Sequence, residues 1–84
     1  MHGLATIKKL NNHVAVYEAR YLFKNHFKLS GAGRVYLDAL GRCESEYGEK
    51  GVKVQILYIL SNARAVGDEG KQAKKRLLAY ANAK

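Results

Sequence analysis

The sequence contains no proline, no tryptophan and only one cysteine among its 84 residues. A single cysteine cannot form an internal disulfide, and this scarcity is typical of proteins in a reducing, cytoplasmic compartment. No apolar run approaches the roughly 20 residues that are needed to cross a bilayer. No apolar segment of a secretory signal follows Met1 either. The sequence therefore predicts a cytoplasmic protein without a membrane segment.

Acidic residues are also few, with seven Asp and Glu against 15 Lys and Arg, and the formal net charge is +8. An excess of positive charge favours an anionic partner. Hydrophobic residues make up 48% of the chain, which argues against disorder. A chain of this length has room for one domain, so residues 1–84 are expected to fold as a single unit.

Glycines supply the breaks that proline does not. They form three clusters, Gly31 with Gly33, Gly48 with Gly51, and Gly67 with Gly70. Between the clusters, apolar residues recur at intervals of three and four, which is the spacing of one helix face. The pattern predicts an all-α fold, a small bundle of three to four helices. The expected helices cover residues 4–29, 32–47, 52–66 and 68–83, with Ser30 and Asp68 as N-caps.

Residues 52–60 also allow a second interpretation. Val52, Val54 and Ile56 alternate with polar residues, as in a half-buried strand. Leu57 and Ile59 interrupt this alternation in its second half, so a helix is favoured and a strand stays open.

The first predicted helix has two apolar faces. One face continues through Val14, Tyr17 and Tyr21, and the opposite face contains Ala19 and Phe23. Two such faces are more than a small bundle can bury, so association into a homodimer or docking on a protein partner is expected to cover the remaining apolar surface. Most aromatic side chains fall on apolar faces and are expected in the core, whereas Tyr58 is the best candidate for an exposed ring.

No motif indicates catalysis, a metal site or a cofactor. His13 and His26 point about 140° apart on one predicted helix, so they cannot share an ion. Cys43 continues an apolar stripe and is expected to be a small core residue rather than a nucleophile. The glycine-rich turn before Arg34 follows a helix rather than a strand, which favours a flexible connection over a phosphate cradle. The sequence thus predicts a binding protein with no enzymatic activity.

Basic residues form two stripes, one on the first predicted helix and one on the last. Lysine and arginine neutralise phosphates, so this pattern favours nucleic acid as the partner, bound with little reading of base sequence. The predicted contacts are Lys9, Arg20, Lys24, Arg34, Lys71, Lys75 and Arg76. The sequence leaves open whether the ligand is DNA or RNA, and whether the two stripes lie on one face.

A protein-interaction module is the alternative hypothesis. Such an adaptor or inhibitor would dock on an acidic surface of a host protein through apolar and basic patches. Small accessory proteins of phages and mobile elements are similar in size and also lack catalytic motifs, which is an analogy of size alone. The predicted protein interface comprises Ile7, Leu10, Val14, Tyr17, Tyr21 and Tyr58.

Overall fold

The computed structural model describes residues 13–83, and this part of the chain forms four helices and one short ribbon of two strands. In chain order they are α2 (Val16–His26), β1 (Phe27–Leu29), α3 (Gly31–Asp38), α4 (Leu40–Ser61), β2 (Ala63–Ala65) and α5 (Gly67–Asn82). The prediction of a small all-α bundle is therefore confirmed. Within residues 13–83, every helix is either too short or too polar to cross a bilayer.

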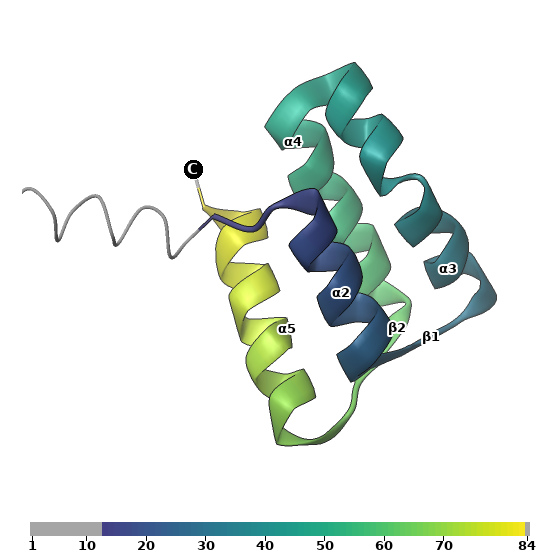
Figure 1. The fold of residues 1–84 in the computed structure, drawn as a ribbon, viewed down its shortest axis with the longest axis vertical. Helices are drawn as coiled ribbons and strands as arrows, with labels where there is room; N and C mark the ends of the chain where they lie inside the picture. The colour runs from purple at the N-terminus through teal and green to yellow at the C-terminus, as the bar shows by residue number, and fades with distance from the viewer. Residues whose placement is uncertain (1–12, 84) are drawn as a thin grey trace, which may run out of the picture.

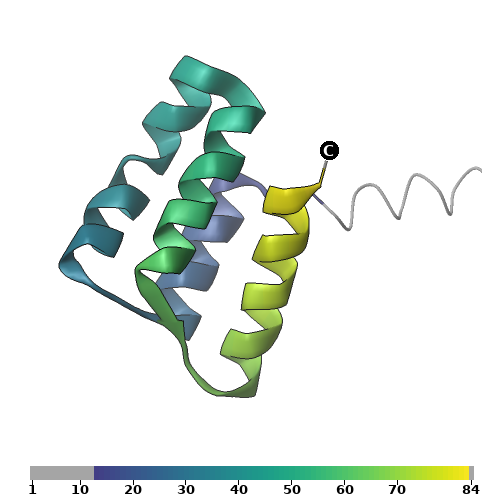
Figure 2. The same ribbon diagram turned by 180° about the vertical axis from the view of Figure 1, so that it is seen from behind.

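The helices pack around a single core. Helices α2 and α5 lie side by side, α4 lies behind them, and α3 packs on α4 at the far edge from α5 (Figures 1 and 2). Helices α2 and α5 are antiparallel, because Arg76 reaches Glu18 near the start of α2 while Glu69 reaches His26 at its end. The largest fully buried side chains are Phe23, Leu40, Ile56, Ile59, Leu77, Val14 and Val52.

Helix α4 reverses direction at Gly48, which has φ 68° and ψ −157°. Glycine adopts this left-handed backbone without the steric cost that a β-carbon imposes. The two parts of α4 then lie so close that a β-carbon added at Gly51 would meet Tyr47 Cβ at 2.5 Å. The predicted break at this glycine cluster is confirmed. Residues 52–60 are helical, so the strand alternative is wrong.

The ends of two predicted helices are wrong because residues 27–29 and 63–65 form strands. Strands β1 and β2 pair antiparallel, with Phe27 opposite Ala65 and Leu29 opposite Ala63. The backbone N–H of Val66 donates to the carbonyl of His26 at 2.9 Å and continues this pairing. The ribbon ties the end of α2 to the start of α5 (Figure 1).

The first predicted helix also begins too early. Residues 13–15 are not helical, and Val14 is only 1% exposed because it packs into the core. Tyr17 and Tyr21 are 80% and 60% exposed, so the inward face of α2 is the one with Ala19 and Phe23. Ile7, Lys9 and Leu10 lie outside the described residues.

One of the two predicted N-caps is confirmed. The Ser30 hydroxyl accepts a hydrogen bond from the Gly33 N–H at 3.0 Å at the start of α3. Helix α5 begins at Gly67, so Asp68 lies in its first turn instead of at the cap position. In this first turn, the Asp68 carboxylate still interacts favourably with the positive end of the helix dipole.

Candidate nucleic-acid interface

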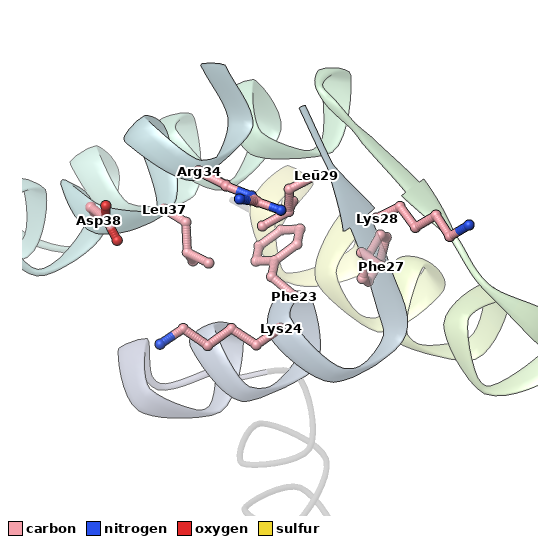
Figure 3. A pocket seen from close by; sticks show the side chains of 8 residues that line it. All are labelled: Phe23, Lys24, Phe27, Lys28, Leu29, Arg34, Leu37 and Asp38. Carbon is pink, nitrogen blue, oxygen red and sulfur yellow. The ribbon is translucent and has the colours of Figure 1, made fainter. Parts of the chain in front are cut away.

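An open groove of about 580 Å³ separates α2 from α3 (Figure 3). It exists because each of these helices packs on other elements more than on its neighbour across the groove. Apolar side chains lie along its floor: Phe23, Phe27, Leu29 and Leu37. Phe23 and Leu37 are buried, yet the groove as a whole presents more apolar than polar surface, with the charged side chains on its walls.

Two predicted contact residues stand on opposite walls of this groove. Lys24 extends from α2, and the Arg34 guanidinium reaches from α3 over Phe23 and Leu29 (Figure 3). Asp38 supplies the one carboxylate in the lining. The groove therefore joins one residue of the first predicted stripe to a basic residue of the next helix.

A third cation, Lys28, connects the groove to the ribbon. Lys28 lines the groove and is also the direct cross-strand partner of Arg64. Both side chains are exposed, whereas their neighbours in the strands are more buried. We define the cationic patch as Lys24, Lys28, Arg34 and Arg64.

Sequence reasoning missed Lys28 and Arg64 as functional candidates. Each lies in an apolar–basic–apolar triplet, Phe27 to Leu29 and Ala63 to Ala65. Such alternation is the signature of a strand with one buried face, although three residues are too few to identify it securely. The triplets could have indicated that both cations share the outer face of one ribbon.

The positive charges of the cationic patch are not compensated by ion pairs within residues 13–83. Among residues 13–83, no hydrogen bond or ion pair engages the side chains of its four cations. Like charges directly opposite one another across two strands destabilise the pairing. An anion bound over Lys28 and Arg64 would relieve this repulsion.

The remaining predicted contacts lie elsewhere. Arg20 packs on Gly41, where an added β-carbon would meet a guanidinium nitrogen at 3.1 Å. Lys71 and Lys75 are exposed on α5, and Lys71 lies about 140° around the helix from Arg76, which faces α2. Arg20 and Lys24 lie beside α4 and α3, whereas Lys71 and Lys75 belong to α5, which lies on the other side of α2 (Figure 1). Lys9 lies outside the described residues.

Most tyrosines are exposed, contrary to the expectation that they belong to the core. The exposed rings are Tyr17, Tyr21, Tyr36, Tyr47 and Tyr58. Tyr58 was the ring predicted to be exposed, and this is confirmed. Val14 is buried in the core, so it cannot contribute to the predicted protein interface.

Tyr80 is the buried tyrosine of the described chain, and it anchors a polar cluster at the other end of the bundle. Its hydroxyl donates to Glu49 Oε2 at 3.2 Å, and His13 Nδ1 lies 3.4 Å from the same oxygen. Burial, the negative charge of Glu49 and the hydrogen bond to it together raise the pKa of Tyr80 to about 12, with burial as the largest cause. The cluster fastens the segment before α2 to α4 and α5.

Within residues 13–83, no group of three or more His, Cys, Asp or Glu side chains could hold a metal ion. Cys43 is partly buried and unpaired by any disulfide. A β-carbon at Gly33 would meet the Asn62 carbonyl oxygen at 2.8 Å, so packing explains this glycine without a phosphate cradle. Comparisons with protein-family models, curated proteins and solved structures find no match to this chain.

Proposed function

We propose that the protein is a non-enzymatic nucleic-acid-binding protein whose cationic patch neutralises backbone phosphates, with little reading of base sequence. The observation that carries this proposal is the direct opposition of Lys28 and Arg64 on the exposed face of the ribbon. Two like charges in this position repel one another and destabilise the pairing of the strands. A phosphate bound between them would remove this repulsion and form charged hydrogen bonds, so both effects would favour binding.

The shape of the patch also supports a polyanionic ligand. Lys28 lies in both hollows, the groove with Lys24 and Arg34 and the shallow hollow with Arg64. A chain of phosphates can therefore contact all four cations in succession, which a single small anion cannot do. With four phosphate contacts, the log–log dependence of affinity on salt should have a slope of roughly −3 to −4.

Fluorescence anisotropy over a salt series tests the proposal. Labelled duplex and single strands are titrated with the wild type, with Lys28→Gln/Arg64→Gln, and with the matched control Lys71→Gln/Lys75→Gln. Both variants lose the same net charge. We expect the patch variant to bind at least about tenfold more weakly and to flatten the salt slope by about two, because two contacts are lost. The control should change both quantities much less.

Two results would overturn the proposal. Absence of binding by the wild type at low salt removes nucleic acid as the partner. Equal losses in the patch variant and in the control show that net charge, and not the patch, produces the binding.

A protein-docking module remains the second candidate, and the groove favours it. Its apolar floor and its cations at Lys24, Lys28 and Arg34 suit a partner that presents acidic and apolar side chains together. In a nuclease-treated extract, one protein should then be retained by the wild type and released by Lys24→Gln/Arg34→Gln. Loss of all retention on nuclease treatment would contradict this alternative.

The mass of the protein in solution tests the homodimer that the apolar faces predict.

A further inference from the structure

Two exposed tyrosines face one another on α3 and α4. The ring centroids of Tyr36 and Tyr58 lie 5.9 Å apart with an interplanar angle of 42°. The side chains are 37% and 54% exposed, and no hydrogen bond engages either hydroxyl within residues 13–83. The pair therefore contributes little to the core and presents aromatic faces to solvent.

The surroundings hold the pair in place and add a cation. Gln55 Nε2 donates to the Tyr36 carbonyl oxygen at 2.8 Å, which ties α3 to α4 beside the rings. A hollow of about 330 Å³ adjoins the rings, and Arg42 and Glu46 both line it. A planar group stacked on a ring can thus also lie within reach of a guanidinium, which stacks on aromatic systems.

Asn62 lies between Tyr58 and the ribbon end of the cationic patch. Asn62, one helical turn beyond Tyr58, donates to the Tyr58 carbonyl at 3.0 Å. The Asn62 carbonyl accepts from the Ser30 N–H at 3.0 Å, directly beside the ribbon. Asn62 and Ser30 line the same hollow as Lys28 and Arg64. Asn62 thus contacts the backbone of Tyr58 and also lines the hollow beside the cross-strand cations, which places Tyr58 one helical turn from that hollow.

Proteins that bind single strands combine cations along the backbone with aromatic rings on which bases stack. Bases in a duplex are already stacked and paired, so they cannot reach a surface ring. We propose that Tyr36 and Tyr58 form a stacking platform for unpaired bases, which makes single-stranded nucleic acid the preferred ligand. This inference rests on the proposed function, because the patch must hold the phosphates for a base to reach the rings.

The test compares three nucleic acids of equal length: a single strand, the duplex that contains it, and a single strand with abasic sites. Tyr58→Ala and Tyr36→Ala remove one ring each, Tyr58→Phe keeps the ring without its hydroxyl, and Tyr17→Ala is a control for an exposed tyrosine on α2. Far-ultraviolet circular dichroism and thermal melting establish that each variant is folded.

We expect Tyr58→Ala to weaken binding of the single strand by about tenfold, and to change binding of the duplex and the abasic strand by less than about twofold. Tyr58→Phe and Tyr17→Ala should match the wild type. Because the chain has no tryptophan, its intrinsic emission comes from tyrosine, and the single strand should quench it less in Tyr58→Ala.

The outcomes separate this inference from the proposed function. If the wild type binds the single strand and the duplex but Tyr58→Ala and Tyr36→Ala leave single-strand binding unchanged, the stacking platform is wrong and the proposed binding by the cationic patch is retained. If single strand and abasic strand lose affinity equally, the rings do not stack on bases. If the wild type binds no nucleic acid, both proposals fail, and a protein contact becomes the explanation of the exposed pair.

Discussion

Arg76 on α5 holds Glu18 on α2 through two nitrogens, with Nε and an Nη each 2.8 Å from the carboxylate oxygen Oε2. The same guanidinium donates to the His13 carbonyl oxygen at 3.3 Å. Arg76 thus joins α5 to α2 and to the segment that precedes it. Sequence reasoning placed Arg76 among the nucleic-acid contacts, whereas its observed partners assign it to the seam between two helices.

Arg76→Ala should lower the free energy of unfolding by about 1 kcal/mol. A partly exposed ion pair with short contacts contributes a stability at the upper end of the range known for surface ion pairs. Urea denaturation of Arg76→Ala, Glu18→Ala and the double variant measures their coupling. Lys75→Ala, which removes an exposed cation from the next position, should leave the stability nearly unchanged. A coupling near zero would show that the two side chains do not stabilise one another.

The cross-strand cations predict a gain in stability on charge reversal. Lys28→Glu or Arg64→Glu replaces a repulsive pair by an attractive one and should raise the free energy of unfolding by about 0.5 kcal/mol. The double variant places two carboxylates opposite one another and should return to about the wild-type value. Each single variant should also bind nucleic acid more weakly. A single reversal that destabilises the fold would contradict the observed register.

Two glycines of α3 should respond in opposite ways to alanine. Gly33→Ala would bring a β-carbon to 2.8 Å from the Asn62 carbonyl oxygen, which the backbone cannot easily relieve. We expect a loss of about 1–3 kcal/mol in urea denaturation. Gly31→Ala has no atom within 4 Å of the new carbon and should be neutral or slightly stabilising. Equal effects at both positions would argue against the close packing of α3 on the end of α4.

Tyr80 predicts a loss of stability at alkaline pH. Its pKa in the folded chain is raised from 10.0 to about 12, with burial as the largest cause. Between these values the unfolded chain releases the phenol proton before the folded chain does, so stability falls as the pH rises. Tyr80→Phe cannot ionise, and its stability should fall less steeply in that interval.

The difference between wild type and Tyr80→Phe is the informative quantity, because lysines ionise in both proteins. At neutral pH the wild type should be more stable by up to about 1 kcal/mol, since the phenylalanine lacks the hydrogen bond to Glu49. This advantage should shrink above about pH 10. A constant difference across the alkaline range would mean that the pKa of Tyr80 is not raised by folding.

Local patterns predicted the helices where the apolar repeat was long. The repeat through Val52, Ile56 and Ile59 identified the second part of α4, and Gly48 marked the reversal before it. The strands were missed because each has three residues, and their pairing joins segments far apart in the chain that no local repeat records. Val14 keeps helical spacing with Tyr17, yet it precedes α2 and fills the core from a non-helical segment.

The candidate site was predicted only in part, for the same reason. Lys24 and Arg34 belong to helices, and helical spacing selected Lys24. Lys28 and Arg64 become neighbours only through the ribbon, so their relation is tertiary. The tyrosines were misplaced because an amphipathic ring counts as apolar in a periodicity argument, although it tolerates exposure on a surface.

The ribbon closes a loop that contains the whole of α3 and α4. Closing this long loop costs chain entropy, so we expect its strands to meet after these helices have folded back on one another. The ribbon adds to the direct packing of α2 and α5 on α4, so its opening is coupled to that packing. The amide protons of Ser30 and Val66, which are bonded at the two ends of the ribbon, should therefore exchange with solvent through cooperative unfolding and not through fraying of single helices.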